Sequence, residues 1–271
     1  MDTAPIFNKI SDKYDRFNHL FSLNIDKKWR RQCAKAAFLQ ASRVASLSGR
    51  QVSDIKVLDL ACGTGDLSIE LAKRGLNVTG VDISEGMLEV GRRKIDRLWQ
   101  GKNSKYPKPV LEKGDGADLP FGDASVDIVT IGYGIRNFDD RPTSLSQILR
   151  VLSPGGVLLI LEFGQPRNRF VRAAYKPYFR YMIPGMASAL TKGKDKAEYK
   201  YFIKSVENFP KFEKFCNELS QAGFRQAEFK SQTFGISVLY KAFKPMEKWY
   251  FFLGIPSGRF FLRCSMLWTC A

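Results

Sequence analysis

Three aspartates and a glycine turn near one buried apolar run could form a ligand site. Asp59 and Asp66 flank the turn Gly63-Thr64-Gly65, and Asp82 follows about twenty residues after the first glycine. A glycine turn at the start of a helix presents backbone N–H groups to a ligand. A carboxylate at the position of Asp82 can accept hydrogen bonds from both hydroxyls of a ribose. The pattern therefore predicts a nucleoside site built around Gly63, Gly65 and Asp82.

The residues around the turn favour S-adenosylmethionine over a dinucleotide. A dinucleotide fingerprint has a third glycine three residues after the second, and this chain has Ser68 there. The carboxylates of Asp59 and Asp66 would repel a pyrophosphate but would suit the sulfonium and ammonium groups of the methyl donor. We therefore expect S-adenosylmethionine as the cofactor. The weaker alternatives are NAD and a turn that binds nothing.

Apolar runs that alternate with helical patterns place this turn in an α/β fold. Strands are predicted at residues 57–60, 77–81, from 110, 126–131, 157–163, 225–230 and 236–243, separated by helices that begin at Asp66, Ser84, Thr143 and Pro210. Such alternation is typical of a parallel sheet that binds ligands at the carboxyl ends of its strands. At that edge Asp115 could accept a hydrogen bond from an adenine amino group, and Gly116 would let the ring approach.

Length and composition restrict the class of protein. The 271 residues suffice for one α/β domain with additions, which we place at residues 1–245. No apolar run reaches the length of about eighteen residues that a membrane span requires. Five cysteines without ligand spacing and a single histidine predict no metal site. The first residues show neither a signal-peptide core nor a transit-peptide pattern, so a reducing cytoplasmic compartment is expected.

The net charge of +16 is concentrated outside the predicted donor-binding core. Residues 51–163 hold fourteen Lys and Arg against sixteen Asp and Glu, whereas residues 164–214 hold twelve against four. A basic surface can bind nucleic acid or an anionic membrane, or can only keep the protein in solution. The insertion at residues 164–208 adds many aromatic residues to this charge. It predicts a helical cover on the sheet edge, a cation-rimmed mouth for a large apolar substrate, or both.

The N-terminal residues 1–50 are predicted to form a helical lid. Apolar residues from Phe7 to Phe17 fall on one face at helical spacing, within a segment of mostly helical pattern at residues 6–31. One interpretation is a helix that caps the edge of the sheet. The alternative is a lid over donor and acceptor, with Tyr14 and Asp15 pointing inward.

Several motifs together resemble the ubiquinone/menaquinone biosynthesis C-methyltransferases, over residues 6–244. They are Phe7-Asn8-Lys9-Ile10, Tyr14-Asp15, Trp29-Arg30-Arg31, Asp59 to Asp66, Asp82, Leu119-Pro120-Phe121, Gly134-Ile135-Arg136-Asn137, Pro154-Gly155-Gly156 and Leu161-Glu162-Phe163. The resemblance implies a Rossmann-like class I S-adenosylmethionine-dependent methyltransferase, whose seven-stranded, mostly parallel sheet has an antiparallel last strand. It also implies donor contacts from Thr64, Asp82, Asp115, Gly116 and Gly132. One departure is Tyr240, near which the family usually has a histidine.

The resemblance implies C-methylation of a polyprenyl quinol, whose ring carbon attacks the sulfonium methyl. Such a transfer needs positioning of the two reactants and stabilisation of charge on the quinol oxygen. Arg136 is the predicted group that holds this oxygen or orients a water, Asn137 would fix the ring, and Tyr14 is a second candidate on the lid. The alternative for Arg136 is a structural ion pair with Asp139 or Asp140. Demethylmenaquinol is the expected acceptor, with 2-methoxy-6-polyprenyl-1,4-benzoquinol as the alternative.

Two other functions are compatible with parts of the sequence. The chain could methylate another lipid-like acceptor, or it could be a basic protein that binds nucleic acid. Strands with regularly exposed aromatics and a basic stripe would be needed for the latter, and the predicted core is neutral. No nucleic-acid partner is therefore expected, although salt-sensitive retention of the protein on RNA would support the nucleic-acid-binding alternative. A homodimer is left open.

The tail at residues 246–271 begins after the last predicted strand. It is rich in Trp, Phe and Tyr and carries three cationic side chains against one acidic side chain. This composition is typical of an anchor that lies in the membrane interface without crossing it. We expect the tail, together with the basic insertion, to hold the enzyme on an anionic membrane surface. A tail without a role is the alternative.

Overall fold

The computed structural model describes residues 22–101, 103–182 and 196–246, together with Pro5, Asn8, Ser11, Asp15, residues 18–20 and Gly185. Tyr14, part of the insertion and the tail from residue 247 lie outside the described residues. The strands are β1 Lys56–Leu60, β2 Asn77–Asp82, β3 Val110–Lys113, β4 Val126–Gly132, β5 Leu152–Phe163, β6 Arg225–Gln232 and β7 Ser237–Phe243. Each predicted strand is therefore present, with ends that differ by a few residues.

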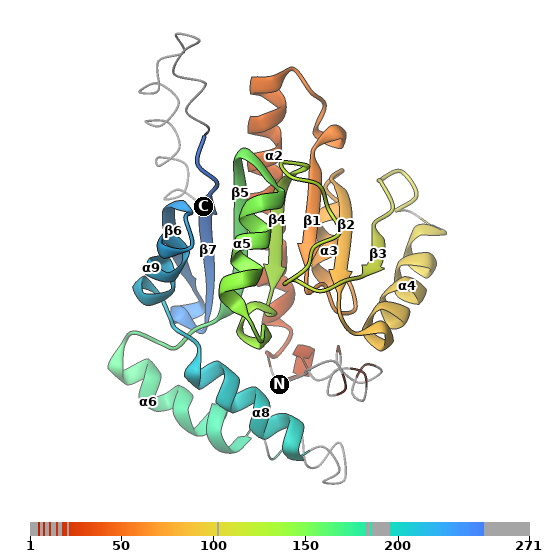
Figure 1. The fold of residues 1–271 in the computed structure, drawn as a ribbon. Helices are drawn as coiled ribbons and strands as arrows, with labels where there is room; N and C mark the ends of the chain where they lie inside the picture. Colours follow the sequence, from red (N-terminus) through yellow and green to blue (C-terminus); the bar gives the residue numbers. More distant parts are fainter. Residues whose placement is uncertain are drawn as a thin grey trace.

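The seven strands form one sheet in the order β3-β2-β1-β4-β5-β7-β6 (Figure 1). β7 runs antiparallel to both of its neighbours, while the pairs from β3 to β5 are parallel. This confirms the predicted seven-stranded sheet with an antiparallel last strand. The strand order reverses between β1 and β4, and in open α/β sheets a ligand binds beside that point, at the carboxyl ends of the strands.

Helices cover both faces of the sheet (Figure 1). The helices are α2 Ile25–Ser48, α3 Asp66–Ala72, α4 Glu85–Trp99, α5 Arg141–Val151, α6 Arg169–Pro177, α8 Lys196–Asn208 and α9 Glu213–Gln221. Apolar side chains of α2, α3 and α4 form one core cluster with the sheet, and those of α5 and α9 form a second cluster. Both faces of the central strands are thus buried, which is why their sequences are nearly continuous apolar runs.

The helix α2 belongs to this core rather than to a lid. Its side chains Trp29, Cys33 and Ala37 are buried against the sheet. Before it, Leu23 and Asn24 adopt left-handed backbone conformations, with φ of 51° and 62°. The mostly helical pattern of residues 6–31 is therefore interrupted at this turn, because left-handed residues end a right-handed helix. Only the segment before α2 remains a candidate lid.

The insertion lies beyond the carboxyl edge of the parallel strands. Its described parts are α6, the π-helical turn Tyr178–Met182 and α8, which lie below the sheet in Figure 1. α8 approaches the short helix Ile135–Asn137 that follows β4, because the Tyr201 hydroxyl donates to Asn137 Oδ1 at 3.3 Å. The insertion thus covers the edge where a ligand is expected. Among the described residues, we find no helix both long and apolar enough to cross a membrane.

Tyr240 occupies the region where the resembling family usually has a histidine. Its side chain is fully buried in β7, and its hydroxyl accepts the Phe212 backbone N–H at 2.8 Å. Its ring packs edge-on against Phe215 of α9, with the ring centroids 4.9 Å apart. The Tyr240 side chain therefore fixes α9 on the sheet. The tyrosine that departs from the family's usual histidine thus lies in the core and does not line a cavity.

Candidate functional site

The glycine turn between β1 and α3 brings backbone N–H groups to Asp82. Gly63 and Gly65 have φ of 55° and 75°, in the left-handed region that favours glycine. The Gly63 N–H donates to Asp82 Oδ2 at 2.8 Å, and the Ser84 N–H donates to Oδ1 at 2.9 Å. Burial raises the pKa of Asp82, and the bonds from Ser84 and Gly63 oppose that rise. Asp82 is thus a fixed carboxylate at the end of β2, as predicted.

A cavity of about 300 Å³ opens beside Asp82 at the carboxyl edge of the sheet. Five predicted donor residues line it, namely Gly63, Asp82, Asp115, Gly116 and Gly132, and the predicted ring-fixing residue Asn137 lines it as well. The remaining walls come mostly from the loops that follow the strands and include Tyr133, Phe138 and Met87. Six residues predicted from the sequence therefore meet in one cavity, within the size range of small-molecule sites.

Asp59, Thr64 and Gly65 are not among the residues that line this cavity. The Asp59 carboxylate is fully buried and accepts hydrogen bonds from Ser68 Oγ at 2.5 Å and Thr130 Oγ1 at 2.7 Å. Burial raises the pKa of Asp59 to about 6, although both hydroxyls act in the opposite direction. Asp59 therefore ties α3 and β4 to β1 below the turn. Ser68, which replaces the third glycine of a dinucleotide motif, is one of its partners.

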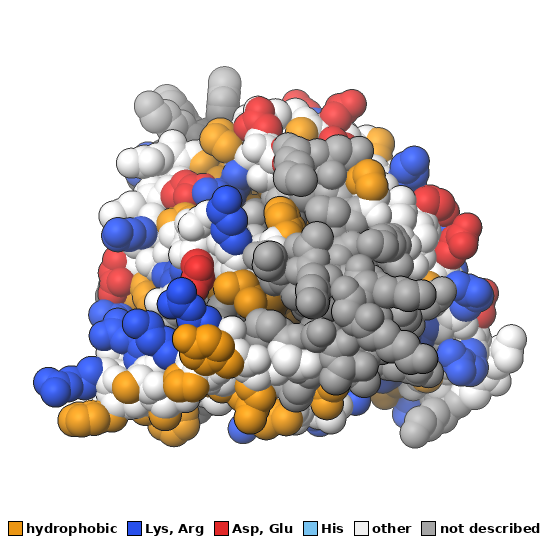
Figure 2. Space-filling view, turned by 90° about the horizontal axis from the view of Figure 1, so that it is seen from below, with side chains coloured by type: hydrophobic (Ala, Val, Ile, Leu, Met, Phe, Trp, Pro, Cys, Tyr) orange, Lys and Arg blue, Asp and Glu red, His pale blue; other side chains and the backbone are white. Residues whose placement is uncertain are grey.

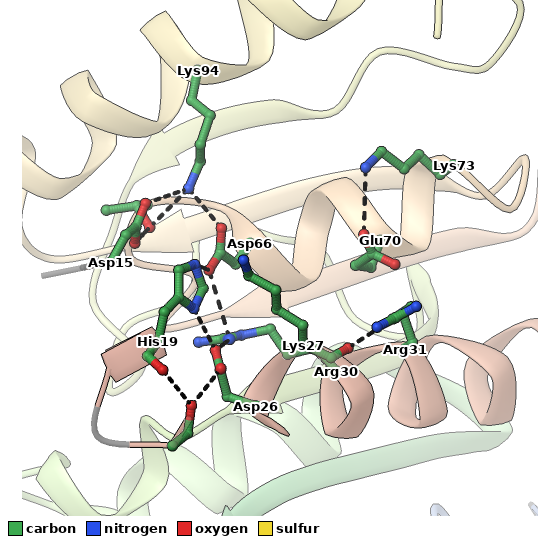
Figure 3. A network of polar contacts seen from close by, with 12 residues as sticks. Asp15, His19, Asp26, Lys27, Arg30, Arg31, Asp66, Glu70, Lys73 and Lys94 are labelled. Atoms are coloured by element: carbon green, nitrogen blue, oxygen red, sulfur yellow. Dashed lines mark hydrogen bonds and ion pairs between the residues drawn. The ribbon is translucent and has the colours of Figure 1, made fainter. Parts of the chain in front are cut away.

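Asp66 belongs to a polar network that joins the turn to the N-terminal segment (Figure 3). Lys94 of α4 donates to Asp66 at 2.7 Å and to Asp15 at 2.8 Å. Thr64 donates to the other oxygen of Asp15 at 2.5 Å. Burial would raise the pKa of Asp66, but Arg30 and Lys94 lower it below its ordinary value. Asp66 therefore does not present an unpaired charge to the cavity.

This pairing corrects the electrostatic argument for a cationic donor. To attract a sulfonium or ammonium group, Asp59 and Asp66 would have to face the ligand as free carboxylates. One is buried below the turn, and the other is paired with Lys94 and lies 3.6 Å from Arg30. Among the acids predicted to contact the donor, Asp82 and Asp115 line the cavity, and Asp139 and Asp140 line it as well.

The single histidine of the chain joins the same network. His19 Nδ1 lies 2.8 Å from Asp26 Oδ2, and both residues lie near Asp66, so their ligand atoms fall within 4.8 Å of one another. The Arg30 guanidinium is hydrogen-bonded to Asp26 and lies beside Asp66 (Figure 3). A cationic side chain thus already compensates these carboxylates. We interpret the cluster as an ion network that holds α2 to the start of α3.

Arg136 lies in a buried ion pair rather than in the lining of the cavity. Its Nη1 donates to Glu162 Oε1 at 3.0 Å and to the Tyr133 carbonyl, and only 4% of its side chain is exposed. Its Nε donates to Ser205 Oγ of α8 at 3.3 Å. The alternative of a structural ion pair is therefore found in kind, with Glu162 as a partner of Arg136. Glu162 ends β5, the strand adjacent to β4, so strand order brings this acid beside Arg136.

Asp140, one of those expected partners, has another role. Its carboxylate accepts the Thr143 N–H at 3.0 Å and the Thr143 hydroxyl at 2.6 Å at the start of α5. These bonds satisfy a donor at the helix N-terminus and lower the pKa of Asp140. The acid therefore caps α5.

A second, aromatic cavity of about 240 Å³ lies between α2 and the insertion. Its lining includes Ile25, Trp29, Phe163, Tyr175, Tyr178 and Phe202, with Ser22 and Thr233 among its few polar groups. The sequence indicated an aromatic mouth in the insertion, and Tyr175, Tyr178 and Phe202 come from it. The contribution of Trp29 was missed, because its partners are distant in the sequence. Its indole N–H donates to Thr233 Oγ1 at 2.9 Å.

Tyr133 lies between the two cavities. It lines the first, and its ring stacks on Phe163, which lines the second, with the ring centroids 4.5 Å apart. Tyr133 has a φ of 61°, and its hydroxyl lies 3.3 Å from Ser237 Oγ. A non-glycine residue in this conformation is held there by its surroundings, and such residues concentrate at functional sites. Between two glycines, this tyrosine gave no signal in the sequence.

Comparison with known proteins shows the family to which the chain belongs. The model of the ubiE/COQ5 methyltransferase family matches residues 2–244. Over 240 residues the chain is 39% identical to demethylmenaquinone methyltransferase of Chlorobaculum parvum, covering 88% of this chain and 91% of that protein. Over 246 residues it is 36% identical to the ubiquinone/menaquinone biosynthesis C-methyltransferase UbiE of Geobacter sulfurreducens, covering 89% and 88%.

Solved structures of methyltransferases share the fold. An S-adenosylmethionine-dependent methyltransferase from Thermotoga maritima aligns with a TM-score of 0.53 at 20% identity, covering 90% of this chain and 100% of that one. Phosphoethanolamine N-methyltransferase 2 of Haemonchus contortus, in complex with S-adenosyl-L-methionine, aligns with a TM-score of 0.50 at 17% identity. That alignment covers 71% of this chain and about half, 49%, of the solved one. From its sequence match and its fold, the chain belongs to the ubiE/COQ5 methyltransferase family.

Proposed function

We propose that this protein transfers a methyl group from S-adenosylmethionine to a ring carbon of a polyprenyl quinol, with demethylmenaquinol as the acceptor. The family and the names of the relatives, among them demethylmenaquinone methyltransferases, support this activity. The observation that carries it is the pair of neighbouring cavities, whose walls touch where Tyr133 stacks on Phe163. One cavity has polar groups suited to a nucleoside, and the other has aromatic walls suited to an apolar ring.

The first cavity fits the methyl donor. Asp82 would accept hydrogen bonds from the ribose hydroxyls, because its two oxygens are already oriented by N–H groups of Gly63 and Ser84. A Cβ added to Gly116 would lie 3.2 Å from the ring of Phe138, so the glycine keeps open a narrow space for a flat base. Asp115 would accept from the adenine amino group. The donor supplies an electrophilic methyl carbon, and the chain supplies its position.

The second cavity fits an apolar acceptor. Trp29, Phe163 and Phe202 offer faces and edges against which a quinol ring can stack. Productive transfer requires the reacting atoms to approach within about 3–3.5 Å. The junction at Tyr133 and Phe163 is where the ring and the methyl group would meet. Asn137, which lines the first cavity and bonds Tyr201 of the insertion, would orient a ring hydroxyl there.

Arg136 would then act as a positioning residue. It links the carbonyl of Tyr133, the carboxylate of Glu162 and the hydroxyl of Ser205. These contacts hold the loop after β4 against β5 and α8. Tyr14, predicted as a second catalytic group on the lid, lies outside the described residues, and its role remains a proposal.

Purified protein with S-adenosylmethionine and two reduced, short-chain acceptors tests this function. We expect a demethylnaphthoquinol to gain one methyl group by mass spectrometry, with slower methylation of a methoxy-benzoquinol. Loss of two charge-assisted hydrogen bonds in Asp82→Ala should weaken donor binding, each bond being worth roughly 1.5–3 kcal/mol. The matched control is Asp123→Ala, whose side chain is 79% exposed. No methyl transfer to either quinol would overturn the proposal.

A further inference from the structure

We propose that α6 and the π-helical turn after it dock the protein on an anionic membrane surface, in the orientation that opens the aromatic cavity toward the lipid. The orientation rests on the proposed function, whereas the docking surface rests on the side chains themselves. The apolar ridge consists of Phe170, Ala173, Ala174, Pro177 and Tyr181, and all five are exposed. Phe170 and Tyr181 are each 72% exposed, which is unusual for aromatic side chains of this size.

Helical spacing makes the ridge continuous. Its α6 members recur at intervals of three and four residues, which places them on one face of the helix. The turn Tyr178–Met182 then extends the exposed surface with Tyr181 and Met182, the latter 54% exposed. No side chain of α6 itself is buried in the core.

Cationic side chains run beside the ridge. Arg169, Arg172, Lys176 and Arg180 are exposed and recur at the same helical spacing. The sequence from Gly164 to Met182 contains no Asp or Glu. Figure 2 views this end of the molecule and shows hydrophobic side chains and Lys or Arg together along its lower left edge, on the side where α6 lies in Figure 1. Aromatic residues flanked by cations are what an interfacial helix inserts into anionic lipid.

The other side of the same segment faces the aromatic cavity. Tyr175 and Tyr178 line that cavity and are only partly exposed. An α-helix with its side chains is about 10–12 Å across. A bilayer that receives the ridge would therefore lie about one helix width from the cavity. A polyprenyl chain could then remain in the lipid while its ring enters the protein.

A protein partner or a nucleic acid would use this surface differently. A nucleic acid would need bases stacked on aromatics along a basic groove, whereas here the apolar residues form a convex ridge with the cations beside it. A protein partner would need a pocket complementary to the ridge, whereas a lipid bilayer accommodates the ridge without one. We therefore commit to lipid, and the other occupants become outcomes of the experiment.

Co-sedimentation of the full chain with vesicles tests the proposal. We expect binding to vesicles containing roughly one-third phosphatidylglycerol, and much weaker binding to phosphatidylcholine alone. Phe170→Ser/Tyr181→Ser and, separately, Arg172→Glu/Lys176→Glu should each lower the partition coefficient by roughly tenfold or more. The matched controls are Leu39→Ser/Leu47→Ser, whose leucines are 50% and 56% exposed on α2, and Lys35→Glu/Arg97→Glu at exposed positions.

The outcomes separate docking from catalysis. Equal vesicle binding by wild type, Phe170→Ser/Tyr181→Ser and Arg172→Glu/Lys176→Glu would overturn the proposal. An equal loss of binding in the control variants would overturn it as well. Preferential binding of RNA or of a second protein through Phe170 and Tyr181 would also overturn it. Methylation of a water-soluble, short-chain quinol should be unchanged in Phe170→Ser/Tyr181→Ser, because neither of these two side chains lines either of the two cavities. If that activity is absent from wild type while the ridge governs vesicle binding, the proposed function fails and the docking surface stands.

Discussion

Arg136 and Glu162 show how burial decides the role of a charged residue. The two side chains are 4% and 0% exposed, and the acid also accepts the Phe163 N–H at 2.8 Å. An arginine fits this site because its planar group can serve several acceptors at once. Removing one partner of a buried pair leaves an uncompensated charge, which costs more than the pair contributes.

Arg136→Met should lower the free energy of unfolding by about 3–5 kcal/mol. Arg136→Met/Glu162→Gln should recover much of that loss, because no isolated charge then remains. Urea denaturation of the two variants measures the difference. If the double variant regains stability but not kcat, Arg136 acts in turnover beyond its structural pairing. Equal stability of wild type and the single variant would contradict the buried ion pair.

Asp59 should impose a pH dependence on stability. Its pKa rises from the ordinary 3.8 to about 6 in the folded protein. Between these values the folded state retains a proton that the unfolded state has released, so the group's contribution to stability falls as pH rises. Relative to Asp59→Asn, wild type should lose roughly 2 kcal/mol between pH 4 and pH 6.5. Parallel unfolding curves for the two proteins across this range would refute the shift.

At the scale of elements, α4 positions the donor turn through close contact. Gly91 lies at the point where α4 crosses the turn after β1. A Cβ there would lie 2.6 Å from Leu111 Cδ1 and 3.1 Å from the backbone carbonyl of Thr64. Lys94, one turn later, bonds the Thr64 hydroxyl at 3.1 Å. The same face of α4 therefore sets both the backbone and the side chain of the turn.

Gly91→Ala should weaken donor binding by roughly fivefold, if about 1 kcal/mol of strain falls on the turn. Alanine normally favours a helix over glycine by about 1 kcal/mol, so a loss of stability would show that sterics dominate. Calorimetric titration with S-adenosylmethionine and urea unfolding provide the two readouts. Gly122→Ala is the control, because a Cβ there meets nothing within 4 Å. Unchanged donor affinity would show that only the Leu111 side chain moves to accommodate the new Cβ and that the turn keeps its position.

At the scale of the whole molecule, the described sheet is complete at Phe243. β7 pairs with β5 along its whole length and with β6 on its other side, and the Lys244 N–H still donates to the Gly156 carbonyl at 2.9 Å. At the opposite edge, Asn18 and Ser22 line the aromatic cavity together with Tyr175, Tyr178 and Phe202 of the insertion. Membrane attachment, if it follows the ridge on α6, would therefore leave the core and its stability untouched.

Truncation after Met246 separates the predicted roles of the tail and the ridge. The truncated chain should unfold at nearly the same urea concentration as the full chain, because the paired strands remain. Its partition onto anionic vesicles should fall but stay sensitive to Phe170→Ser/Tyr181→Ser. Co-sedimentation at moderate salt measures both effects. A tail without a role predicts no change on truncation.

The sequence by itself determined the local framework of the site. Gly63 and Gly65 require left-handed backbone, and buried strands require apolar runs, so the turn and the strands could be placed from residue types alone. The place of Asp82 at the end of β2 could be predicted because it depends on two adjacent elements, β1 and β2. The aromatic composition of the insertion indicated an apolar mouth, and Tyr175, Tyr178 and Phe202 lie there.

Only the tertiary structure decided which charges face the ligand. Asp59 and Asp66 look alike beside the turn, yet one bonds Thr130 on the neighbouring strand and the other bonds Lys94 on α4. Arg136 likewise meets Glu162 because β4 and β5 are adjacent. These partners lie far apart in sequence, and burial makes each pairing necessary, since an unpaired charge inside the protein is costly. A carboxylate's role therefore depends on the strand order, which no local pattern encodes.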